Sequence, residues 1–274
     1  MTSPKQVIVS GGFDDIRSRD LRFLEEAARF GELTVLLWPD EVLSQHTGKT
    51  PKFPWAERLY FLNAVRYVTR VLPLPAPLDV HTLPMVEGVS PQVWVDEEGP
   101  ASGPRSAFCR QHGIEHRILT ASQISGFPEP PPMPSAPGRK KIVVTGCYDW
   151  FHTGHVRFTE EVSAYGDLYV ILGHDANIRL LKGPGHPLFP EEERRYVVGS
   201  IKYVKQALIA TGDGWVDADP DIRRLKPDIY AVNEDGDKGG KREYCEKMGI
   251  EYLVLKRAPA PGLQSRSSSD LRGF

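Results

Sequence analysis

Short apolar, β-branched runs alternate with longer amphipathic stretches along the second half of the chain. Five of these runs predict buried strands, at residues 141–144, 167–173, 203–208, 228–232 and 251–255. Between them the pattern favours helices over residues 154–164, after Pro190 and over residues 238–248, where Gly249 supplies a natural end. Strands that alternate with helices predict right-handed crossovers and a parallel sheet with helices on both faces. Ligands of such sheets bind beyond the carboxyl ends of the strands.

The first half of the chain repeats the second. Residues 9–14 match residues 144–149, so that Gly11 stands 135 residues before Gly146. After one residue of slippage the match continues to the chain's later segments, where Cys109 aligns with Cys245. A register kept over about a hundred residues indicates two copies of one fold. The fold class we expect is therefore α/β, with two tandem Rossmann-like, doubly wound parallel-sheet domains.

A proline-rich stretch separates the copies. Residues 127–138 contain six prolines, which exclude a helix or a central strand and favour a stiff, extended linker. We expect one domain over residues 1–126, the linker over residues 127–138 and a second domain over residues 139–274.

Composition narrows the class of protein. The chain has 274 residues, 40% of them hydrophobic, and a formal net charge of −2, which gives no reason to expect a nucleic-acid partner. No apolar run approaches the ~20 residues of a membrane span, and no signal-peptide core follows the start. Three widely spaced cysteines argue against a disulfide framework. We expect a cytoplasmic protein without a membrane partner.

Candidate chemistry follows the first strand of the second copy, in His152-Thr153-Gly154-His155. If a helix begins there, its free N–H groups and dipole offer an anion site, and Gly154 lets a ligand approach the backbone. Imidazoles beside that site can donate to phosphate oxygens and stabilise charge on a departing pyrophosphate. A metal pair or two ordinary surface histidines are the alternatives. A metal site would need a third protein ligand, and none is obvious from spacing.

Four ordered motifs carry a family resemblance. The segments resemble the motifs of the cytidylyltransferase-like nucleotidyltransferase superfamily, above all the ethanolamine-phosphate and glycerol-3-phosphate cytidylyltransferases. They are Gly146-Cys147-Tyr148-Asp149 with His152-Thr153-Gly154-His155; Lys182-Gly183-Pro184 with Pro190 to Arg194; Asn233-Glu234-Asp235; and Arg257 with Arg266 to Leu271.

The resemblance implies roles for individual residues. His152, His155 and Lys182 would be catalytic, with Lys182 neutralising the α-phosphate and the phosphate of the acceptor. A larger set would bind the nucleotide: Gly146, Cys147, Tyr148, Gly154, Arg194, Asn233, Asp235, Arg257, Ser267, Ser268 and Ser269. Asp149, Trp150 and Asp175 would approach the acceptor. Mg²⁺ would accompany the triphosphate, without a protein ligand that we can name.

The resemblance defines the type of reaction more closely than the base of the nucleotide or the acceptor. The resemblance favours transfer of CMP from CTP to a phosphorylated small alcohol, polyol or phosphonate, with release of pyrophosphate. An adenylyltransferase of the ADP-heptose type is the nearest alternative, because residues 179–183 resemble its lysine loop. A non-catalytic nucleotide sensor is the alternative from another class. The long segment 258–266, Ser267 to Ser269 in place of Ser-Thr-Thr, and Cys147 in place of threonine depart from the family pattern.

The first copy lacks this site. It reads Arg17-Ser18-Arg19-Asp20 where the second copy has its two histidines and glycine, and an aspartate there would repel phosphate. We expect an inert copy, either structural or able to bind another anion through Arg17 and Arg19. Within a monomer, the first copy could take the place of a partner subunit and form an intramolecular pseudo-dimer with the second copy. The alternative is a homodimer of the whole chain.

Overall fold

A computed structural model describes residues 4–76, 78–84 and 88–272. The chain divides into two compact units, unit 1 (Met1–Gly126) and unit 2 (Phe127–Phe274). In the part of the chain that the model describes, no helix is long and apolar enough to cross a membrane.

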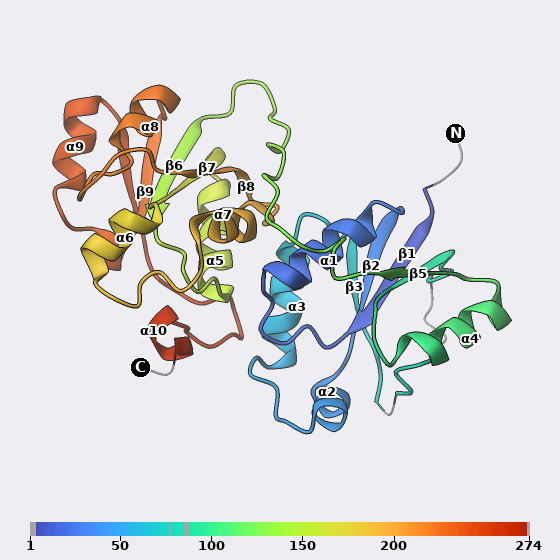
Figure 1. The fold of residues 1–274 in the computed structure, drawn as a ribbon. Coiled ribbons are helices and arrows are strands. Elements are labelled where there is room, and N and C mark those ends of the chain that lie inside the picture. The colour runs from blue at the N-terminus through green and yellow to red at the C-terminus, as the bar shows by residue number, and fades with distance from the viewer. Residues whose placement is uncertain (1–3, 77, 85–87, 273–274) are drawn as a thin grey trace. The chain divides into compact units, whose positions relative to one another are not determined.

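Unit 1 is a parallel five-stranded sheet with interleaved helices, in the strand order β3-β2-β1-β4-β5 (Figure 1). Its elements are β1 (Gln6–Gly11), α1 (Ser18–Ala28), β2 (Glu32–Leu37), α2 (Asp40–Thr47), α3 (Trp55–Ala64), β3 (Arg70–Pro73), β4 (Val93–Glu97), α4 (Ser102–His112) and β5 (Glu115–Leu119).

Unit 2 has the same architecture, and its strand order β10-β9-β6-β7-β8 is that of unit 1 read from the other edge (Figure 1). Its elements are β6 (Lys141–Gly146), α5 (Thr153–Ser163), β7 (Asp167–Leu172), α6 (Asp175–Lys182), α7 (Glu191–Gly199), β8 (Val204–Ile209), α8 (Asp219–Leu225), β9 (Ile229–Asn233), a 3₁₀ turn (Glu234–Gly236), α9 (Lys241–Met248), β10 (Glu251–Leu255) and α10 (Ser268–Arg272). The predicted α/β, doubly wound fold class is confirmed. The common origin of the two units stays a prediction.

Continuous apolar runs form the core of each sheet. Along β6, Ile142, Val143 and Val144 are buried on both faces of the sheet, as a covered parallel strand requires. Cys245 lies in the core of unit 2 and Cys109 in that of unit 1, as their matching positions suggested. The register of β6 with β7 runs from Lys141 opposite Asp167 to Gly146 opposite Leu172, so both strands end at one edge.

Several boundaries differ from the expected ones. α9 begins at Lys241, later than the predicted residue 238, because Gly239 and Gly240 take left-handed φ values of 75° and 72°. The apolar pattern did not reveal α6 and α8, which are only eight and seven residues long.

The proline-rich segment lies against unit 2. The Met133 N–H donates to the Lys205 carbonyl at 2.9 Å, and Pro130 packs where a Cβ on Gly199 would come within 2.9 Å of its ring. The proline-rich segment is therefore packed against α7 at Pro130 and bonded to β8 at Met133.

Candidate active site

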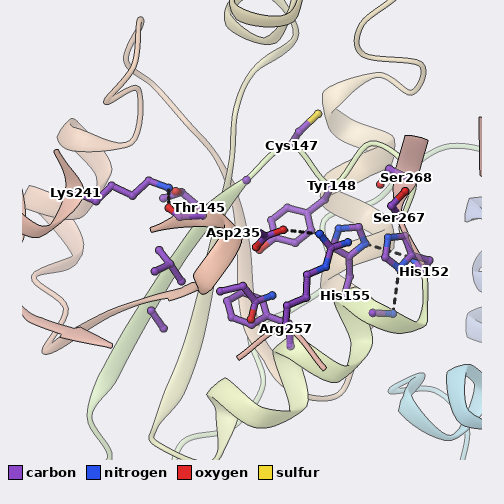
Figure 2. A pocket seen from close by; sticks show the side chains of 17 residues that line it. Thr145, Cys147, Tyr148, His152, His155, Asp235, Lys241, Arg257, Ser267 and Ser268 are labelled. Carbon is purple, nitrogen blue, oxygen red and sulfur yellow. Dashed lines mark hydrogen bonds and ion pairs between the residues drawn. The ribbon is translucent and has the colours of Figure 1, made fainter. Parts of the chain in front are cut away.

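A cavity of about 340 Å³ lies beyond the carboxyl ends of β6 and β9 in unit 2 (Figure 2). Parallel sheets of this kind bind ligands at that edge. Residues from three of the four predicted motifs and from neighbouring positions line the cavity: Thr145, Gly146, Cys147, Tyr148, His152, Gly154, His155, Phe158, Ala231, Val232, Asn233, Asp235, Gly236, Lys241, Arg257, Ser267 and Ser268. The motif of Lys182 and Arg194 does not contribute to the lining.

The two histidines are held by the first turn of α5. His152 is its N-cap, and the His152 Nδ1 accepts the Gly154 N–H at 3.1 Å. The His155 Nδ1 accepts the His152 N–H at 3.3 Å, and the two rings lie 4.0 Å apart between centroids. Because each Nδ1 accepts a backbone hydrogen bond, the proton of each neutral ring sits on Nε2. Each imidazole can then donate from Nε2.

His155 has surroundings that keep it neutral. Its ring stacks on Phe151 with centroids 5.2 Å apart, and it packs against Tyr148 at 5.3 Å. Burial lowers the pKa of His155 well below its usual value, and the charges of His152, Arg257 and Lys182 add to this shift. At neutral pH, His155 is therefore an uncharged hydrogen-bond donor.

Glycine is required between the histidines. A Cβ on Gly154 would lie 2.9 Å from His152 Cε1 and 3.0 Å from its Nδ1. Any side chain there would displace the imidazole that caps the helix. The bare backbone of Gly154 leaves the N-terminus of α5 open to an anion.

The last motif contributes Arg257, Ser267 and Ser268 to the cavity lining. The Arg257 guanidinium pairs with Asp235 and donates to the Arg266 carbonyl at 3.0 Å. The Ser268 hydroxyl donates to the Trp150 carbonyl at 3.1 Å. The Ser268 contact fixes the start of α10 beside the segment before α5, 118 positions earlier in the chain. Ser269 lies in α10, but its side chain is outside the described part of the structure.

Arg194 lies elsewhere, buried beneath the ends of the strands with 1% of its surface exposed. Its Nε donates to the Phe189 carbonyl at 2.9 Å and its Nη1 to the Cys147 carbonyl at 2.7 Å. Its Nη2 donates to the Gly173 carbonyl at 2.9 Å and to Asp175 Oδ1 at 2.7 Å. Neither Arg194 nor Asp175 lines the cavity.

Unit 1 contains the same arginine cluster without the histidines. Arg58 is 1% exposed, and its Nε donates to the Phe53 carbonyl at 3.1 Å. Its two terminal nitrogens donate to the Gly12 and Trp38 carbonyls and to Asp40 Oδ1. The buried arginine therefore makes the same kind of contacts in both units, with or without the histidines.

Asp149 also bonds within the chain. Its Oδ1 accepts the N–H groups of Leu188 at 2.7 Å and Phe189 at 3.0 Å, which fixes the loop before α7. Asp14 of unit 1 accepts the N–H groups of Lys52 and Phe53 in the same way.

Two other predicted residues lie outside the cavity lining. Lys182 is the exposed last residue of α6, although its charge reaches His155. The Trp150 ring packs edge-on against Phe189, with centroids 5.9 Å apart.

Sequence reasoning missed Lys241 and Thr145, which both line the cavity. The pair Gly239-Gly240 directly before Lys241 was the available signal, since two left-handed glycines often shape a loop around a ligand. Among residues 4–76, 78–84 and 88–272, no three His, Cys, Asp or Glu side chains gather in a group that could hold a metal.

The corresponding place in unit 1 is occupied by charges that pair with one another. The Arg17 N–H donates to Asp20 Oδ2 at 2.8 Å, and the Arg17 side chain pairs with Asp15. Arg19 pairs with Glu97 at 2.6 Å. Burial raises the pKa of Asp20 to about 6, against the lowering effect of the Arg17 backbone N–H.

Comparison with known proteins agrees with the geometry of unit 2. The family model described as cytidylyltransferase-like matches residues 143–273. An FAD synthase of Ferroglobus placidus is 38% identical over 120 residues, which cover 43% of this chain and 75% of that protein. An FAD synthase of Methanospirillum hungatei JF-1 is 34% identical over 134 residues, 48% of this chain and 82% of that protein. The chain belongs to the cytidylyltransferase-like family of nucleotidyltransferases.

Other relatives are longer or more distant. The bifunctional protein HldE of Campylobacter curvus is 32% identical over 142 residues, which are 51% of this chain but 27% of that protein. A lipopolysaccharide core biosynthesis protein of Thermoplasma volcanium GSS1, of known structure, is 23% identical with a TM-score of 0.38, covering 45% of this chain and 99% of that chain.

Proposed function

We propose that unit 2 transfers AMP from ATP to the phosphate of a small molecule and releases pyrophosphate. The sequence motifs favoured CTP, with adenylyl transfer as the alternative. FAD contains an adenylyl group, so relatives named FAD synthase support ATP as the donor. FMN and a heptose phosphate are the acceptor classes that the relatives suggest.

One observation carries the proposal: two imidazoles, each with its Nδ1 held by a backbone N–H, line the cavity at the start of α5. A helix N-terminus attracts phosphate through its free N–H groups and dipole. An acceptor phosphate oxygen would attack the α-phosphorus in line, forming a new P–O bond while the bond to the bridging oxygen breaks. His152 and His155 would donate hydrogen bonds to the departing pyrophosphate, where negative charge increases.

Other predicted residues support this role. Arg257 and Ser268 would hold the nucleotide, since both line the cavity. Lys182 would approach the phosphates from the exposed end of α6. Mg²⁺ would accompany the triphosphate and take most of its ligands from phosphate oxygens and water, as this ion commonly does.

We assign Arg194, Asp149 and Asp175 to positioning in place of the substrate contacts first expected. Their hydrogen bonds join the loop before α7 to the ends of β6 and β7. Unit 1 keeps the matching arginine contacts but has Asp20 in place of the second histidine, which supports an inert unit 1.

Pyrophosphate release tests the proposal. The protein is incubated with Mg²⁺, each of the four nucleoside triphosphates and FMN, heptose 1-phosphate, glycerol 3-phosphate or phosphoethanolamine. We expect ATP to be preferred. His155→Ala should lower kcat by about a hundredfold or more, as loss of a transition-state donor does, and should retain nucleotide binding.

His112→Ala, at an exposed position of unit 1, is the control and should be fully active. A preference for CTP would overturn adenylyl transfer. If the protein binds nucleotide but releases pyrophosphate with no combination of nucleotide and acceptor, the result would favour a non-catalytic nucleotide sensor.

A further inference from the structure

Three leucines are exposed on the segment that carries Lys182. The exposed fraction is 74% for Leu180 and 48% for Leu181, both in the last turn of α6, and 48% for Leu188 in the loop before α7. An apolar side chain of this size gains free energy when a partner covers it, and exposed apolar side chains that gather in one segment mark sites of interaction. The segment therefore offers apolar contacts that the fold itself leaves uncovered.

Hydrogen bonds close this segment into a projection from the sheet. The Asp175 N–H, at the start of α6, donates to Glu191 Oε2 at 2.6 Å, at the start of α7. Asp175 Oδ1 also accepts a hydrogen bond from the buried Arg194 at 2.7 Å. The two ends of residues 175–191 are therefore joined, and the leucines lie on the part between them.

The projection lies beside the histidine turn. The Leu188 N–H donates to Asp149 Oδ1 at 2.7 Å, in the segment that links β6 to α5. At the other end of the same loop, the charge of Lys182 contributes to the lowered pKa of His155. The exposed leucines are therefore next to residues that act on phosphate in the proposed function.

Unit 1 exposes polar side chains at the matching positions. Its helix α2 has eight residues, as α6 has, and its sixth and seventh residues are Gln45 and His46 in place of the two leucines. The Lys52 N–H donates to Asp14, as that of Leu188 donates to the matching aspartate. All three of these unit 1 residues are exposed. The fold therefore does not require apolar residues here, and they occur in the unit that has the histidines.

Positive charge adjoins the leucines, since Arg179 and Lys182 lie in the same turn of α6 and are exposed. A ligand that matches this surface has a phosphate for the cations and an apolar body for the leucines. Of the acceptor classes named above, FMN has such a body, whereas a heptose phosphate is covered with hydroxyl groups. We propose that residues 180–188 bind the apolar body of the acceptor, which is a phosphate monoester of an aromatic compound. This assignment rests on the proposed function and separates such acceptors from sugar phosphates.

The double variant Leu180→Gln/Leu181→Gln tests the assignment, because glutamine suits a helix but removes the apolar contact. Tyr165→Gln is the matched control, since Tyr165 is 49% exposed in the same unit but lies directly before β7, at the amino ends of the strands. FMN fluorescence, titrated with α,β-methylene-ATP present, gives acceptor binding without turnover. Competition by riboflavin and by glycerol 3-phosphate separates binding of the ring from binding of the phosphate. Sedimentation measures the oligomeric state of each protein.

We expect the double variant to raise the Kd for FMN and for riboflavin about tenfold or more, the effect of losing contact with two leucines. The Kd for glycerol 3-phosphate should change less than about threefold, because that ligand has no apolar body to lose contact. Tyr165→Gln should bind FMN as the wild type does.

An unchanged Kd for FMN, an equal loss in Tyr165→Gln, or a wild type that binds glycerol 3-phosphate as tightly as FMN would each refute the assignment. A wild-type dimer that dissociates in the double variant would also refute it, because the leucines would then contact a second copy of the chain. Failure of the proposed function would appear differently, as absence of pyrophosphate release from the wild type.

Discussion

Asp20 occupies the place in unit 1 where unit 2 has His155, and replacing it should stabilise unit 1. Burial is the largest effect on this carboxyl and raises its pKa from 3.8 to about 6. A group with a raised acid pKa binds more protons in the folded state, so stability falls as pH rises from about 4 to about 6. Above that window the folded unit carries the full cost of an ionised, poorly hydrated Asp20.

The magnitude follows from the shift. About two pKa units at 1.36 kcal/mol each give about 3 kcal/mol, and partial solvent access reduces this to about 2–3 kcal/mol. Asparagine cannot ionise, and its side-chain oxygen can still accept the Arg17 N–H. Asp20→Asn should therefore raise the free energy of unfolding of unit 1 by about 2–3 kcal/mol at pH 7.5 and by almost nothing at pH 3.5.

Urea titration at both pH values measures the change, with amide hydrogen exchange of α1 peptides assigning the transition to unit 1. Peptides from β6 and α5 serve as the internal control and should exchange as in the wild type. A variant that is destabilised at pH 7.5, or stabilised equally at both pH values, would refute the linkage argument.

Two further variants test the clusters around the site. Arg194→Met should lower the free energy of unfolding of unit 2 by about 3–5 kcal/mol, because Asp175 and three carbonyls lose their donor, and should abolish pyrophosphate release. Arg58→Met should destabilise unit 1 similarly but leave the release intact; equal effects on activity would contradict the assignment. Since the pKa of His155 is lowered on folding, unit 2 should lose stability as pH falls below about 6.5, by up to about 1.4 kcal/mol per pH unit. His155→Asn should flatten that slope in urea titrations from pH 7.5 to 5, and identical slopes would show that His155 does not titrate as inferred.

Local sequence was sufficient for much of the fold and for the centre of the site. Apolar runs marked β6, β7 and β9, because a strand covered on both faces needs apolar residues at successive positions. The run at residues 251–255 also formed a strand, β10, but at the edge of the sheet, where none of its residues is fully buried. His152, Gly154 and His155 were recognisable because they act within one helical turn, where spacing in sequence equals spacing in space. Helices as short as α6, with eight residues, give too few turns for the pattern to be recognised with the same ease.

The amino-acid sequence by itself determined the α/β class, the repeated pattern and the histidine pair, since each depends on neighbours only a few residues apart. The tertiary structure alone decided which charges face a ligand. Arg194 has the sequence context of a nucleotide contact, yet its donors reach carbonyls 47 and 21 residues away, and its side chain is buried outside the cavity lining. Lys241 has an ordinary context at a helix start, yet the fold brings the start of α9 to the cavity, where Lys241 lies beside residues from the end of β6. Burial and partners at long range set these roles, and no local pattern specifies them.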